Sequence, residues 1–221
     1  MSRRTGLLND NEKDMGKTNI DWPGLSKTIN PIVGCANECS YCYAKRMNNR
    51  FKWIEDFTKP QFFVDRLKIP STVKKPCTWF VGSVCDIFSD NVKLWWVDAI
   101  IKMAAESPRH TFMFLTKKPE HYRNFVWPLN CWLGTTVETM NKTYRLNGLW
   151  DLKNMSFVSV EPILGTFENV SFPPTVSLVI VGADSSKGAK IPPLEWVKSV
   201  QHPNIYYKAN LRKHYPELIN K

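Results

Sequence analysis

Seven short apolar segments constrain the fold of this chain more than any other feature of its sequence. Each is rich in β-branched or aromatic residues and is apolar throughout, which is typical of strands buried on both faces of a parallel sheet. Such strands need covering elements on both sides. The predicted strands are residues 28–34, 78–83, 111–116, 131–136, 156–161, 177–182 and 204–208.

Helical patterns lie between these strands. Residues 91–107 carry apolar residues at helical spacing, and shorter helical patterns begin at Pro119, Thr139 and Pro192. Strand followed by helix, repeated along 221 residues, predicts an α/β fold built from parallel βαβ units. Six or seven such units favour an open or partial (β/α) barrel over a complete eight-fold barrel, with a doubly wound open sheet as the main competitor.

The chain shows no repeat and no linker rich in glycine and serine. We therefore expect a single barrel domain over residues 19–221. The polar residues 1–18 precede it, and we expect them to form a flexible N-terminal segment, as chain termini often do.

Polar residues stand near the ends of almost all the predicted strands. In α/β barrels the carboxyl ends of the strands form the active-site face, and an inward-facing charge there needs a partner or a ligand. Taken singly, each residue is better explained as a helix cap or a turn former, but the whole ring favours a polar site. The ring consists of Ser83, Asp86, Thr116, Lys117, Thr135, Thr136, Glu138, Ser159, Glu161, Asp184, Ser185 and Lys208.

Three of the six cysteines lie within eight residues, at Cys35, Cys39 and Cys42, directly after the first predicted strand. Disulfide frameworks belong to short secreted chains, and a closed zinc site takes four ligands. Three thiolates on a 4Fe-4S iron–sulfur cluster leave one iron without a protein ligand, and an open position lets a metal centre bind a substrate. The spacing therefore predicts a reactive cluster. A zinc site completed by a distant histidine or cysteine is the alternative.

This arrangement resembles the radical S-adenosylmethionine (SAM) superfamily, in which the position of Tyr41 is commonly aromatic. Further segments are most similar to a phage-type radical SAM family of unknown function. Compared with that family, the first two cysteines are closely spaced, Asp184 replaces a glutamate, and Cys85 stands where serine is more usual. The matching segments are INPIVGC, CSYCYA, FVGSVCDIFSD, TFMFLTKKPE, CWLGTTVE, YRLNGL, FVSVEPILG, VIVGADSS and EWVKSV, which occur in this order over roughly residues 20–208.

The resemblance implies an α/β fold, the partial (β/α)6 barrel of the radical SAM type, in which Cys35, Cys39 and Cys42 hold a 4Fe-4S cluster. SAM bound there would be cleaved reductively to a 5′-deoxyadenosyl radical, with the electron supplied by an external donor of the flavodoxin or ferredoxin type. The outcome of the reaction is left open.

The resemblance also implies residue roles. Ser83 and Asp86 would bind the amino group of SAM, although Asp86 could instead cap the helix that follows. Arg145 would pair with the SAM carboxylate or with Glu138, and a surface salt bridge is the alternative. The cofactor-side candidates are Tyr41, Ser83, Asp86, Thr135, Thr136, Glu138 and Arg145, followed late in the barrel order by Glu161 and Asp184, which also suit substrate contacts.

Two residues are catalytic candidates. Lys208 follows the last predicted strand, at the substrate side of the barrel. Cys85 follows the second strand, and its weak S–H bond suits the return of a hydrogen atom to a product radical. The alternative for Cys85 is a buried cysteine of the core.

A formal net charge of +10 favours a polyanionic partner. Lys45, Arg46, Lys117 and Lys118 are the basic residues expected to neutralise phosphates, so a nucleotide or nucleic acid base is the expected substrate, ahead of a peptide. The second class of function is a zinc- or cluster-containing nucleic-acid-binding protein without catalysis. The stretch AKRMNNRFKW supports it by interleaving basic and aromatic residues.

The sequence contains no candidate membrane-spanning segment and no signal peptide. No apolar run reaches the ~18 residues of a membrane span, and the N-terminus lacks the apolar centre of a signal peptide. We expect a cytoplasmic protein with reduced thiols, and the phage-type resemblance extends this to the cytoplasm of a host cell.

Overall fold

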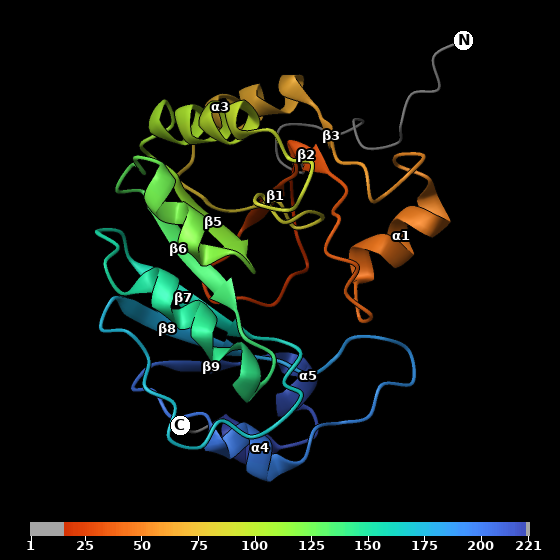
Figure 1. The fold of residues 1–221 in the computed structure, drawn as a ribbon, viewed down its shortest axis with the longest axis vertical. Helices are drawn as coiled ribbons and strands as arrows, with labels where there is room; N and C mark the ends of the chain where they lie inside the picture. The colour runs from red at the N-terminus through yellow and green to blue at the C-terminus, as the bar shows by residue number, and fades with distance from the viewer. Residues whose placement is uncertain (1–15, 220–221) are drawn as a thin grey trace.

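The computed structural model describes residues 16–219. Its main element is a curled seven-stranded parallel sheet whose strands are arranged in chain order, with β1 and β9 at the two edges (Figure 1). A doubly wound sheet reverses its strand order, so the competitor fold is excluded and the predicted α/β partial barrel is confirmed. The strands are β1 (Lys27–Ile29), β4 (Thr78–Val81), β5 (Thr111–Thr116), β6 (Cys131–Thr136), β7 (Ser156–Val160), β8 (Val176–Val181) and β9 (Ile205–Tyr207).

All seven predicted strands form, but the first is interrupted. The prediction of one strand over 28–34 is wrong because β1 ends at Ile29. Pro31 has no N–H to donate, and the chain then turns into β2 (Ile32–Val33), which pairs antiparallel with β3 (Gln61–Phe62). This turn leads the chain away from the sheet and into the cysteine loop.

The helical cover is shorter than the patterns suggested. Residues 91–107 become α3 (Leu94–Ala105), whereas the segments after Pro119 and Thr139 form 3-10 helices. None of the helices within residues 16–219 is long and apolar enough to cross a membrane. The remaining helices are α1 (Tyr43–Phe51), α2 (Ile69–Thr72), α4 (Leu194–Ser199), α5 (Ala209–Arg212), η1 (Val64–Lys68), η2 (Pro119–Asn124), η3 (Met140–Leu149) and η4 (Pro216–Leu218).

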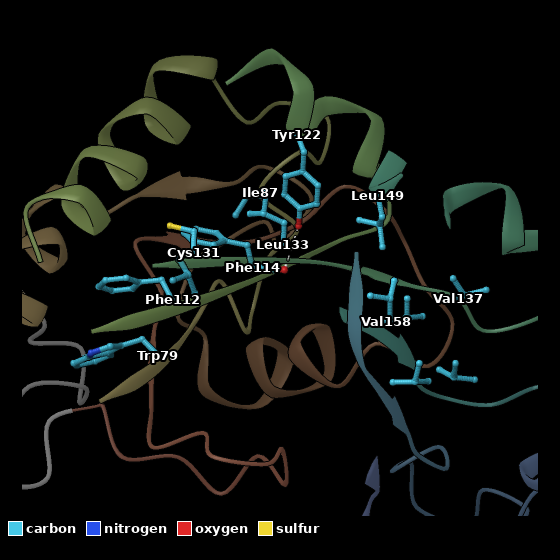
Figure 2. Packing of buried hydrophobic residues seen from close by; sticks show 14 of the residues in the cluster. Trp79, Ile87, Phe112, Phe114, Tyr122, Cys131, Leu133, Val137, Leu149 and Val158 are labelled. Atoms are coloured by element: carbon cyan, nitrogen blue, oxygen red, sulfur yellow. Dashed lines mark hydrogen bonds between the residues drawn. The ribbon is translucent and has the colours of Figure 1, made fainter. Parts of the chain in front are cut away.

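The convex face of the sheet packs against the helices. Phe112, Phe114 and Leu133 are fully buried there, and Tyr122 of η2 points its hydroxyl at the strands (Figure 2). That hydroxyl donates to the carbonyl oxygens of Phe114 and Gly134, at 3.1 and 2.9 Å. A buried hydroxyl needs such partners, so Tyr122 fixes η2 in register with β5 and β6.

A separate apolar core fills the concave face. Trp22, from the segment before β1, lies 4.4 Å from Phe80 and 5.4 Å from Phe157 between ring centroids. Residues 1–15 of the expected flexible segment lie outside the described residues. Residues 16–18 pair with β1, because Lys17 forms an antiparallel bridge with Lys27 and the Gly16 carbonyl accepts from Thr28 at 2.6 Å.

Candidate active site

A cavity of about 530 Å3 lies at the carboxyl ends of the strands. The loops after β2, β4, β5 and β8 contribute to its wall, as do the ends of β6, β7 and β9. This is the functional face of an α/β barrel. The predicted site residues that line the cavity are Cys35, Cys39, Tyr41, Cys42, Ser83, Cys85, Asp86, Thr116, Lys117, Thr136, Ser159, Glu161, Asp184, Ser185 and Lys208.

The cysteine loop is shaped by its backbone. Gly34 precedes the first cysteine with a φ of 104°, and a Cβ there would lie 2.8 Å from the Phe57 carbonyl oxygen, so glycine is required. The Cys35 N–H donates to that same carbonyl at 2.7 Å. At the other end, the Cys42 sulfur accepts the Lys45 N–H at 3.3 Å and caps α1. The loop therefore returns its last thiol to the start of a helix.

The three thiols fit a cluster better than a single ion. Cys35, Cys39 and Cys42 are half-buried and free of disulfides. Within residues 16–219, no three His, Cys, Asp or Glu side chains are placed to share one metal ion. In a cluster each thiolate binds a different iron, so the sulfurs need not meet at a point. Burial raises the pKa of the Cys35 and Cys39 thiols.

The zinc alternative gains no support from His110. This histidine, which could have supplied a fourth ligand, lies in the core instead, with its ring against Trp79 and Phe112. Its Nδ1 accepts the Cys77 N–H at 3.1 Å, and its Nε2 lies 2.9 Å from the Pro70 carbonyl oxygen. Both ring nitrogens are therefore engaged in the core.

Asp86 ties the cysteine loop to the barrel. Its carboxylate accepts from Asn37 Nδ2 at 3.0 Å, Thr116 Oγ1 at 2.6 Å and the Lys117 N–H at 2.8 Å. It also accepts the Phe88 N–H at 3.0 Å. The capping alternative is wrong, because α3 begins at Leu94 and has no side-chain cap. Asp86 therefore lines the cavity with a carboxylate that already accepts four hydrogen bonds.

A buried ionic network lies behind Tyr41. The Tyr41 hydroxyl donates to Glu138, and Lys117 Nζ donates to the Tyr41 hydroxyl at 2.5 Å and pairs with Glu138. Arg145 completes the network at 2.7 Å from the second oxygen of Glu138. Burial alone would raise the pKa of Glu138, but Lys117, Tyr41 and Arg145 together lower it. The network fastens the cysteine loop to the ends of β5 and β6.

This network decides how several predicted residues lie. Arg145 pairs with Glu138, one of the two partners predicted for it, and the pair is buried instead of lying at the surface, with both side chains 8% exposed. Neither residue lines the cavity, and nor does Thr135, whose hydroxyl donates to the Thr116 carbonyl at 2.9 Å on the other face of β6. Lys117 lines the cavity, but its ammonium group is already paired with Glu138.

The other predicted phosphate contacts are also engaged. Lys118 pairs with Asp90 at 2.6 Å, and Lys45 lies 3.8 Å from Glu38. Arg46 donates to the Tyr41 carbonyl at 3.0 Å but keeps its side chain exposed. Arg46 is therefore the member of this set with the most accessible charge.

The opposite wall carries a second ion pair. Lys208 Nζ lies 2.5 Å from Glu161 Oε1, and both side chains are largely buried. A Cβ on Gly182 would lie 2.8 Å from Lys208 Cδ and 3.1 Å from Glu161 Cδ, so the missing side chain makes room for the pair. Asp184 accepts from the N–H and the hydroxyl of Ser186, at 2.7 and 2.6 Å, and shapes the following loop.

Cys85 and Ser83 lie between the two walls. Cys85 lines the cavity with its sulfur beside Gly82 and also packs against the main apolar core, and burial raises the pKa of its thiol well above the ordinary value. The Ser83 hydroxyl donates to Asn30 Oδ1 at 3.1 Å. Cys85 is therefore a protonated thiol that shares the cavity with the three loop cysteines.

Sequence reasoning missed residues that act through distant partners. Asn37 lies within the cysteine motif, so its position was the available signal. Asp21 and Asn210 line the cavity from the N-terminal segment and from α5. Asp21 accepts a hydrogen bond from the Tyr206 hydroxyl at 2.5 Å. Asn210 accepts the Ala183 N–H through Oδ1 and donates to the Ala183 carbonyl through Nδ2. No local pattern marks these two.

Solved structures with a similar fold include spore photoproduct lyase. A cysteine-to-alanine mutant with dinucleoside spore photoproduct matches with a TM-score of 0.54 and 10% identity, over 82% of this chain and 68% of that chain. A double mutant with bound AdoMet and the same ligand matches with a TM-score of 0.51 and 12% identity, over 73% and 57%. At this identity the likeness shows the fold, a partial barrel of the radical SAM type.

The sequence comparisons point to a family described without an activity. No curated protein matches the chain significantly in sequence. Residues 17–208 match the family described as "Protein of unknown function (DUF5131)". This match spans nearly all of the described barrel, and the chain therefore belongs to the DUF5131 family.

Proposed function

We propose that this protein is a radical SAM enzyme acting on a nucleotide or a nucleic acid base. One observation carries the proposal: three free cysteine thiols from a single loop line the cavity at the functional face of a partial barrel. The barrel shared with spore photoproduct lyase, which has been solved with bound AdoMet, supports it.

In this proposal Cys35, Cys39 and Cys42 hold a 4Fe-4S cluster, and SAM binds beside it. Together the two cofactors supply a 5′-deoxyadenosyl radical when an external donor of the flavodoxin or ferredoxin type provides an electron. The residues of this chain would bind the two cofactors, orient them and shield them from water. Asp86 and the Tyr41–Glu138 network keep the cysteine loop in place. The apolar core of the concave face, which includes Trp22, excludes water from the inner end of the cavity.

The opposite wall is the proposed substrate side. Glu161 and Lys208 form a charged pair that can exchange its internal contact for hydrogen bonds to a polar base edge, and Asp184 lies beside them. Cys85 has a protonated thiol in the same cavity and is the proposed donor of a hydrogen atom to the product radical. Its S–H bond would break as the C–H bond forms, and the thiyl radical left on Cys85 would be returned to the thiol by an electron from the external donor and a proton. A dinucleoside is the ligand in both lyase structures, which supports a nucleotide-type substrate here.

The test is anaerobic purification followed by iron and sulfide analysis and incubation with SAM and dithionite. We expect brown protein, near-stoichiometric iron and sulfide, and formation of 5′-deoxyadenosine. Cys35→Ala, Cys39→Ala and Cys42→Ala should each lose the iron–sulfur absorbance, because two thiolates do not retain the cluster. Cys77→Ala is the matched control and should keep it, since Cys77 lies away from the cavity.

Two results would overturn the proposal. Colourless protein that contains zinc instead of iron would favour the nucleic-acid-binding alternative without catalysis. Retention of the full iron–sulfur absorbance by Cys39→Ala would place the cluster elsewhere.

A further inference from the structure

Helix α1 presents an exposed apolar stripe that leads away from the cavity. Tyr43, Met47 and Phe51 recur every four residues along one face and are 39%, 39% and 52% exposed. The buried residues of the helix are Ala44 and Asn48, so its outer face remains open to solvent. At 1.5 Å per residue the three side chains span about 12 Å. Side chains of this size are normally buried, and an ordered row of them indicates a contact surface.

Positive charge flanks this stripe. Arg46 and Arg50 lie one turn apart on the adjoining face and are both exposed, and Lys52 follows at the C-cap. The Arg50 guanidinium lies 5.1 Å from the centre of the Phe51 ring, and Trp53 stacks near Phe51 with 6.2 Å between ring centroids. The sequence from 43 to 54 contains no acidic residue. The surface thus combines aromatic faces with cations along one line.

The stripe is continuous with the cavity. Tyr43 begins α1 and lines the cavity, and its hydroxyl is bonded to the Ser83 carbonyl. The loop after β8, which lines the cavity with Asp184 and Ser185, goes on to Lys187 and Lys190, both exposed. Positive charge therefore lies on two of the segments that adjoin the cavity, α1 and the loop after β8.

We propose that α1 is a docking track for single-stranded nucleic acid, with bases stacked on Phe51 and Tyr43 and phosphates paired with Arg46 and Arg50. Aromatic faces beside a basic line are the arrangement that binds single strands without sequence preference. The track makes the substrate a polymer with one base in the cavity instead of a free nucleotide. Only this last step rests on the proposed function; the docking itself does not.

The experiment measures binding of a fluorescein-labelled single-stranded DNA oligonucleotide to the anaerobically purified full chain by fluorescence anisotropy. Phe51→Leu should weaken binding about fivefold or more, because a base loses its stacking partner, while Phe51→Tyr should bind as the wild type does. The double variant Arg46→Ala/Arg50→Ala should lower the slope of log affinity against log salt by about 1.4, because two phosphates of the single strand no longer have a cationic partner.

The matched controls lie on other faces of the barrel. Trp95→Leu removes an aromatic residue of α3 that is 56% exposed, and Arg109→Ala/Arg123→Ala removes two exposed arginines. Both should bind like the wild type. Equal loss in the controls, no effect of the α1 variants, or no binding at low salt would overturn the inference. So would α1 variants that lose only the electron-donor protein, because that result makes α1 a protein-docking surface.

These outcomes separate the two proposals. Protein that cleaves SAM but binds no oligonucleotide would overturn the docking track and leave the radical chemistry intact. Protein that binds oligonucleotide through α1 but never holds iron would overturn the radical chemistry and leave the track intact.

Discussion

Replacing Trp22 with alanine tests whether the concave core stabilises the open barrel. Trp22 is only 6% exposed and contacts the rings of Phe80 and Phe157. Truncation of a buried tryptophan to alanine costs about 3–5 kcal/mol of unfolding free energy, through reduced burial and the cavity left behind. For a domain of this size each kcal/mol lowers Tm by about 2–4 °C. We therefore expect Tm to fall by about 6–20 °C, measured by differential scanning calorimetry.

Trp22→Phe separates packing from polarity. The indole N–H of Trp22 is buried without a hydrogen-bond partner, and a buried unpaired donor is destabilising. Phenylalanine keeps most of the aromatic contact and removes that donor, so its loss of stability should be less than half that of alanine. Trp150→Ala, at a tryptophan that is 46% exposed, is the surface control and should cost less than Trp22→Ala. A change below about 1 kcal/mol in Trp22→Ala would refute the role of Trp22 as the lumen core.

Two further predictions concern the ionic network behind Tyr41 and the cavity wall. The pKa of Glu138 is lowered in the folded protein, so its carboxylate adds stability that is present above the unfolded-state pKa of about 4.3 and is lost as pH falls through the folded-state value. Glu138→Gln should cost about 3–5 kcal/mol at neutral pH, since two buried cations lose their partner, and should flatten the acid limb of the Tm profile; an unchanged limb contradicts this. Cys85→Ala should still cleave SAM but yield altered products by mass spectrometry, whereas wild-type products would return Cys85 to a packing role.

Local pattern determined the strands and the direction of the sheet. Residues such as Phe112, Phe114 and Leu133 lie in runs that are apolar on both faces, and only a sheet covered on both sides buries such runs. The cysteine loop could also be predicted from the sequence, because the close spacing of the three cysteines places them in one loop independently of the tertiary structure. The end of β1 was missed, since Pro31 had to be weighed against an apolar stretch that continues beyond it.

Tertiary structure alone decided which polar residues face the cavity. Thr135 and Thr136 are neighbours of the same type, yet strand alternation turns one into the convex core and the other toward the site. Glu138, Lys117 and Arg145 neutralise one another only because β5, β6 and η3 converge behind Tyr41. Trp22 fills the lumen because the sheet curls around it. Contacts between residues far apart in the chain depend on how strands pack, and a one-dimensional pattern does not contain that geometry.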